Sequence, residues 1–146
     1  MRFEAKKDKR LIIPVFAVML FGLGAIALSL VDILSQDLTQ EAWIVIGSLS
    51  LFLAALVFIF SSIKNTYYEL REDALYIKFG LIQQTIFYQD ITEVKESKSW
   101  LSSLAWTFDR IAIYKKGRLS VLIGPVEKER FIKEIHRKIN PPSIDF

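Results

Sequence analysis

The stretch LIIPVFAVMLFGLGAIALSLV, residues 11–31, runs for 21 residues without a charged side chain. A helix rises about 1.5 Å per residue, so this run reaches roughly the 30 Å thickness of the apolar core of a bilayer. A second charge-free run, AWIVIGSLSLFLAALVFIFSSI, covers the 22 residues 42–63 and has Trp43, a residue type that favours the headgroup region, near its start. We predict two transmembrane helices, over 11–31 and 42–63, because the apolar region of a cleaved signal peptide is shorter.

The charged segments around these runs predict how the helices cross the membrane. Residues 1–10 (MRFEAKKDKR) hold five basic and two acidic residues, whereas the connection 32–41 (DILSQDLTQE) holds three acidic residues and no basic one. Lys and Arg concentrate on the cytoplasmic side of membrane proteins. We therefore expect a cytoplasmic basic tail over 1–10, an extracytoplasmic loop over 32–41 and a cytoplasmic domain over 64–146. Both termini would face the cytoplasm of a cell whose membrane the chain crosses twice.

The composition of the 146-residue chain excludes several classes of function. Its 52% hydrophobic residues and mean hydropathy of +0.32 are too high for a wholly soluble domain, although 24% charged residues require an aqueous part. The absence of cysteine excludes disulfides, thiolate zinc sites, iron–sulfur clusters and cysteine nucleophiles. His136 is the single histidine, which excludes a multi-histidine metal site. We expect no metal and no cofactor.

Residues 64–146 show the alternation of apolar and polar residues that is typical of strands. Six strands are predicted, at 66–70, 74–79, 84–88, 91–97, 108–115 and 119–123. A hairpin turn is predicted at 116–118, where the sequence is Lys-Gly-Arg. An amphipathic helix is predicted to begin at Gly124-Pro125 and to end before Pro141. The stretch 98–106 fits neither period, and its Trp100 and Trp106 are expected to pack against the core.

Strands followed by one C-terminal helix give the outline of a PH-like domain, a bent β-sandwich or barrel of six to seven strands capped by that helix. Five blocks of sequence carry a resemblance: TYYEL (66–70), LYIKFG (75–80), IFYQDI (86–91), SLAWTFDRI (103–111) and IGP (123–125), followed by Phe131-Ile132. Together they resemble the YyaB-like group of bacterial PH-like domains, which also includes the sublancin immunity protein. The resemblance covers residues 66–140. It implies a small membrane-attached module, with bacteriocin immunity in one branch and no catalytic residues to transfer.

We therefore expect a membrane-anchored α+β protein whose two-helix hairpin is followed by a PH-like domain at the cytoplasmic face. The expected function is non-enzymatic binding of a protein or peptide partner, and the resemblance implies bacteriocin immunity as one such role. The alternative is binding to an anionic lipid surface. Candidate contacts with the membrane surface share a positive charge and a position beside a predicted span. They are Arg2, Lys6, Lys7, Lys9, Arg10 and Lys64.

An enzyme of an unrecognised type is the most distant alternative. Asp109-Arg110 is the most prominent polar pair, but consecutive strand residues point to opposite faces, so we expect a structural salt bridge to a neighbouring strand. The sequence holds no Gly-rich phosphate loop and no Ser-His-Asp set. Basic and acidic residues alternate along the predicted helix, which favours a solvated surface over a nucleic-acid contact.

Overall fold

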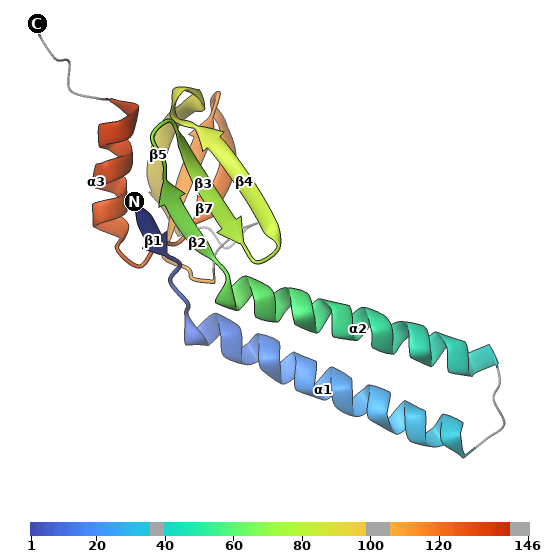
Figure 1. The fold of residues 1–146 in the computed structure, drawn as a ribbon. Coiled ribbons are helices and arrows are strands. Elements are labelled where there is room, and N and C mark those ends of the chain that lie inside the picture. The colour runs from blue at the N-terminus through green and yellow to red at the C-terminus, as the bar shows by residue number, and fades with distance from the viewer. Residues whose placement is uncertain (36–39, 99–105, 141–146) are drawn as a thin grey trace, which may run out of the picture.

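The computed structural model describes residues 1–35, 40–98 and 106–140. Two long helices run side by side away from a β domain, and a third helix lies against that domain (Figure 1). The N-terminus lies within the β domain rather than at the far end of the helices (Figure 1). The chain therefore leaves the domain through the first helix and returns to it through the second.

The two long helices are α1 (Lys9–Leu34) and α2 (Gln40–Lys64), and each contains one of the predicted spans. Asp8 caps α1, because its carboxylate accepts a hydrogen bond from the backbone N–H of Arg10 at 3.1 Å. By length and composition both helices can cross a membrane, and only 6% and 0% of their most apolar stretches is buried. Gly22 faces the ring of Phe52, where a Cβ atom would lie 2.8 Å from Cε2, so this pair marks a close approach of the two helices.

The first sheet has four antiparallel strands in the order β1-β2-β3-β4. Strand β1 (Arg2–Glu4) precedes α1, whereas β2 (Tyr67–Leu70), β3 (Ala74–Phe79) and β4 (Ile82–Phe87) follow α2. Phe3 of β1 is paired with Tyr68 of β2, and the N-terminal amino group donates to the carbonyl of Leu70 at 2.9 Å. The helix hairpin is thus an insertion between two neighbouring strands of one sheet.

The second sheet has three antiparallel strands in the order β5-β6-β7. A short 3-10 helix, η1 (Tyr88–Asp90), leads into β5 (Ile91–Ser97), and β6 (Arg110–Lys115) and β7 (Arg118–Ile123) follow. The predicted hairpin is confirmed, because Lys116 and Gly117 form its turn with φ angles of 50° and 75°. The backbone N–H of Gly124 donates to the Tyr68 hydroxyl at 3.2 Å, which joins the end of the second sheet to the first.

Helix α3 (Lys128–Ile139) buries its predicted apolar stripe against the sandwich. Phe131 and Ile135 are fully buried, and Ile132 and Ile139 pack at the margin of the core. The Phe131 ring meets the Phe3 ring edge-on, with the ring centroids 5.2 Å apart. Seven strands in two sheets and one C-terminal helix, within the described residues, confirm the predicted PH-like arrangement, although the two sheets do not close into a barrel.

The N-terminal segment and the start of the last helix both differ from the prediction. Residues 1–10 are not a free tail, because residues 2–4 form β1 and the side chain of Phe3, only 4% exposed, belongs to the core. The last helix begins at Lys128 rather than at Pro125. Pro125 instead forms an isolated bridge with Ala5, and the N–H of Val126 donates to the carbonyl of Glu4 at 2.9 Å. These contacts with the N-terminal segment keep Pro125 and Val126 out of the helix.

Candidate functional site

The junction between the helices and the domain is held by contacts on both sides of the hairpin. On the α2 side, Asn65 and Thr66 lead directly into β2, and the Thr66 hydroxyl donates to the carbonyl of Ser62. On the α1 side, the N–H of Lys6 donates to the carbonyl of Gly124 and the N–H of Asp8 to the carbonyl of Trp106, both at 2.7 Å. Both helices therefore leave the same end of the domain with fixed backbones.

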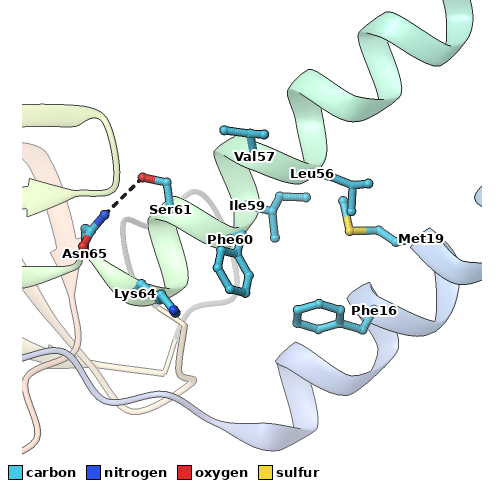
Figure 2. A pocket seen from close by; sticks show the side chains of 9 residues that line it. All are labelled: Phe16, Met19, Leu56, Val57, Ile59, Phe60, Ser61, Lys64 and Asn65. Atoms are coloured by element: carbon cyan, nitrogen blue, oxygen red, sulfur yellow. Dashed lines mark hydrogen bonds between the residues drawn. The ribbon is translucent and has the colours of Figure 1, made fainter.

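A groove of about 510 Å³ opens between α1 and α2 next to the domain (Figure 2). Its walls are apolar side chains from both helices, namely Phe16, Met19, Leu56, Val57, Ile59 and Phe60. Ser61, Lys64 and Asn65 form its polar end, and the Lys64 ammonium lies 4.7 Å from the centroid of the Phe60 ring. This polarity fits an amphiphile, whose chain would lie between the helices and whose anionic group would meet Lys64.

Two of the six candidate membrane-surface residues make contacts within the domain. The guanidinium carbon of Arg2 lies 3.9 Å from the centroid of the Tyr67 ring. The Lys6 ammonium forms an ion pair with the Asp109 carboxylate, with 3.2 Å between Nζ and Oδ2. Both side chains therefore have a role in the packing of β1 and of the segment that follows it.

Lys7, Lys9, Arg10 and Lys64 have exposed side chains at the end of the hairpin next to the domain. Lys9 and Arg10 lie in the first turn of α1, which contains no acidic residue, although the helix dipole disfavours cations at this end. The Asp8 carboxylate at the N-cap of α1 already offsets part of that repulsion. Lys64 lies in the last turn of α2, where the dipole favours a cation. Contact between these four residues and lipid phosphates stays a prediction.

Asp109 is the centre of a surface ion-pair cluster. Its carboxylate accepts hydrogen bonds from the ammonium groups of Lys128 at 2.7 Å and Lys6 at 3.2 Å, and Lys128 also donates to Glu96 at 2.9 Å. The hydrogen bond from Lys128, followed by that from Lys6, holds the pKa of the Asp109 carboxyl below its usual range. The salt bridges of Asp109 thus reach α3 and the segment before α1 rather than a neighbouring strand.

Arg110 lies inside the domain. Its side chain is almost fully buried, its Nε donates to the carbonyl of Thr107, and burial lowers the pKa of its guanidinium. Burial also raises the pKa of Tyr68 to about 12, an effect that the nearby charge of Arg110 opposes. Asp109 is therefore a surface residue and Arg110 a core residue, so the two side chains do not form one polar site.

Trp106 packs against the domain, as predicted. Its ring stacks on that of Phe79 with 6.2 Å between centroids and 17° between planes, and its backbone bridges to Lys7. Phe79 is the last residue of β3, so the stack lies at the end of the sheet from which the helices leave. Trp100 and most of the stretch 98–106 lie outside the described residues.

The profile of the bacterial PH domain family matches residues 66–139, just over half of the chain. This chain belongs to the bacterial PH domain family. The chain is also 29% identical over 142 residues to the uncharacterized protein YyaB of Bacillus subtilis (strain 168), and the match covers 94% of this chain and 92% of that protein. The match confirms the predicted resemblance, and it includes the helix hairpin as well as the bacterial PH domain. No solved structure matches the chain significantly.

Bacterial PH domains of this family are typically non-catalytic. Among the residues that the structure describes, no three His, Cys, Asp or Glu side chains gather in a way that could hold a metal ion. His136 lies on the exposed side of α3. Within the described residues, the candidate site consists of the groove between the helices, with Lys64 at its polar end, and the exposed cations where the hairpin meets the domain.

The sequence pattern did not predict the contacts that join the domain to the two ends of the helix hairpin. The strand Arg2–Glu4 is too short for alternation of apolar and polar residues to be visible. Gly80 has a φ of 59° and lies against Ser62 of α2, but in the sequence it looks like an ordinary turn glycine. One signal was present: Phe3 is the only large aromatic residue in a charged decapeptide.

Proposed function

We propose that this protein is a non-enzymatic bacterial membrane protein that holds a PH-like binding domain against the cytoplasmic face of the membrane. The insertion of the α1–α2 hairpin between β1 and β2 carries this proposal. Because β1 and β2 are hydrogen-bonded neighbours, the chain has to leave and re-enter the domain on one side of a membrane. A pair of spans meets that requirement, and a single span does not.

The charges next to the domain support the cytoplasmic side. Lys7, Lys9, Arg10 and Lys64 lie where the helices meet the domain, and Asp32 lies near the far end of α1. Cationic residues concentrate on the inner side of bacterial membranes. Only two residues separate α2 from β2, so a domain on that side would sit directly against the headgroups.

Single cysteines test this topology in a chain that has none of its own. We expect Asp32→Cys to react with a membrane-impermeant maleimide in intact cells and Arg118→Cys, on the domain, to react only after the membrane is permeabilised. The reverse pattern would contradict the cytoplasmic placement. Reaction of both cysteines in intact cells would contradict the placement of the two helices as spans.

The domain's proposed partner is a protein or a membrane-active peptide, and bacteriocin immunity is the specific role. This proposal rests on the similarity to the YyaB-like group, with the fixed position of the domain at the membrane as support. The full chain, expressed in a sensitive bacterium, is expected to raise the minimal inhibitory concentration of a bacteriocin in a panel that includes sublancin. Unchanged sensitivity across the panel would contradict the immunity role. Protection that survived deletion of residues 64–146 would contradict the role of the domain.

Anionic lipid is the second candidate partner, and the groove with Lys64 at its mouth favours it. A phospholipid would place an acyl chain between Phe16 and Phe60 and its phosphate near the ammonium. We expect Lys64→Gln to lower the phosphatidylglycerol that the purified chain retains, measured by mass spectrometry. Lys116→Gln, an exposed lysine on the β6–β7 turn, is the matched control and should retain the wild-type amount. Equal retention by both variants would rule out this candidate.

A further inference from the structure

The turn between β3 and β4 presents apolar side chains where a turn is usually polar. Gly80 and Leu81 form this turn, because Phe79 and Ile82 are the last paired residues of the two strands. The Leu81 side chain is 68% exposed, and Ile82, the first residue of β4, is 45% exposed. Gly, Asn, Asp, Ser and Pro dominate turns in water, so an exposed Leu-Ile pair calls for another environment.

The position of this turn is fixed by its contact with α2. Gly80 has a φ of 59°, and a Cβ atom built on it would lie 2.7 Å from Cα and 2.8 Å from N of Ser62. Ser62 is fully buried and lies two residues before the end of α2, at the edge of the predicted span. The turn therefore lies against the helix at the level where that helix would leave the bilayer (Figure 1).

The apolar surface of the turn continues the apolar surface of α2. In the turns of α2 that precede Ser62, Phe58 is 37% exposed and Leu51 is 74% exposed, and the helical period places both on the same face as Ser62. These helix residues would face lipid if α2 spans the membrane, and the exposed Leu81 directly follows the glycine that meets Ser62 on that face. A lipid surface is the partner that covers both sets of side chains at once.

We propose that the β3–β4 turn inserts into the cytoplasmic leaflet beside α2, with Leu81 and Ile82 among the upper acyl chains. The partner is the bilayer itself, recognised through its apolar interior rather than through a headgroup. Insertion gives the domain a third attachment besides the two helices, so it fixes the tilt of the domain on the membrane. The proposal rests on the placement of α1 and α2 as spans.

Site-specific fluorescence tests the insertion of the turn in the full chain. Leu81→Cys, labelled with the polarity-sensitive NBD fluorophore, is reconstituted in vesicles of phosphatidylethanolamine and phosphatidylglycerol. The matched control is Phe87→Cys, because Phe87 is also apolar and 49% exposed but pairs with Ala74 at the opposite end of the same strand pair. Leu53→Cys, on the exposed surface of α2, is the reference for a label within the bilayer.

Insertion predicts blue-shifted emission at Leu81→Cys and strong quenching by lipids that carry a doxyl group near the headgroup. Phe87→Cys should show emission typical of water and little quenching, which also shows that the label does not itself drive insertion. If Leu81→Cys resembles Phe87→Cys while Leu53→Cys reports lipid, insertion of the turn is wrong and the spans stand. If Leu53→Cys also reports water, the placement of the helices in the membrane is wrong as well. Circular dichroism of each variant verifies that the fold is retained.

Discussion

The helix hairpin and the β domain place the same types of residue in opposite positions. On α1 and α2, Phe21 is 83% and Leu51 is 74% exposed, whereas Ile77, Ile111 and Phe131 in the domain are fully buried. Burial of apolar side chains stabilises a fold only against water. A helix satisfies its own backbone hydrogen bonds and can present apolar side chains to lipid, whereas the sandwich needs an interior. The difference is the one expected if the domain folds in water and the hairpin lies in lipid.

The two regions are nevertheless one structure, because the strands on either side of the hairpin pair with each other. The chain passes through α1 and α2 between Phe3 and Tyr68, which lie opposite each other in one sheet. The domain is therefore incomplete without the segment that precedes the first helix. Substitutions in each region measure how far the two depend on each other.

The largest effect is expected from the same substitution made in the two solvents. Phe131→Ala removes a fully buried ring that packs edge-on against Phe3, and it should lower the free energy of unfolding of the domain by about 3–5 kcal/mol. Phe21→Ala removes an exposed ring from α1 and should leave the unfolding of the domain unchanged. Denaturant titrations of the full chain in micelles, followed by near-ultraviolet circular dichroism, compare the two. An equal decrease in the free energy of unfolding for both variants would show that the exposed and buried rings are not in different environments.

The next effect concerns β1, which links the regions. Phe3→Ala should cost about 3 kcal/mol, because Phe3 is 4% exposed and contacts Phe131. Arg2→Ala is the neighbouring control. It removes only an exposed contact with the Tyr67 ring, which is worth less than about 1 kcal/mol. A Phe3→Ala variant as stable as wild type in the same titration would mean that residues 1–4 do not belong to the core.

Substitutions at two glycines distinguish the cost of backbone strain from the cost of disturbing the contact between the domain and α2. Gly80→Ala and Gly117→Ala each place a side chain at positive φ, at a cost of about 1–2 kcal/mol. Only at Gly80 does the added Cβ also meet the backbone of Ser62, whereas nothing lies within 4 Å at Gly117. We expect Gly80→Ala to be the more destabilising by about 1 kcal/mol or more, measured by thermal unfolding. Equal effects would indicate that the turn does not rest on α2.

The smallest effect is expected at Asp109. Its ion pairs with Lys128 and Lys6 are partly exposed, so Asp109→Asn should cost less than about 1 kcal/mol at neutral pH. The folded state lowers the pKa of this carboxyl, so its contribution is present above about pH 4 and is lost as the pH falls through the lowered pKa. The difference between wild type and Asp109→Asn should shrink when melting temperatures are compared at pH 7 and pH 3. A difference that grows towards pH 3 would contradict the ion-pair role.

Much of the secondary structure follows from local patterns. The helices contain both charge-free runs, the β6–β7 turn lies at Lys116-Gly117, and Phe131 and Ile135 face the core from α3. Contacts between distant segments, including the groove that α1 and α2 line together, are less accessible to sequence reasoning. Lys6 and Asp109 are 103 residues apart in the sequence, and no periodic pattern joins them. Pro125 looks like the start of a helix, but its pairing with Ala5 keeps it extended.

By itself, the sequence determined which segments are apolar enough for helices of membrane length and which alternate as strands. Those features depend on the period of a single element and on residues close together in the chain. Only the tertiary structure decided that β1 completes the first sheet, that Asp109 joins α3 to the segment before α1, and that Leu81 stands beside the end of α2. Each of these depends on contacts between distant segments. The free energy that stabilises these contacts depends on the burial of Phe3 and on the packing of Gly80 against Ser62. Both exist only once the chain has folded.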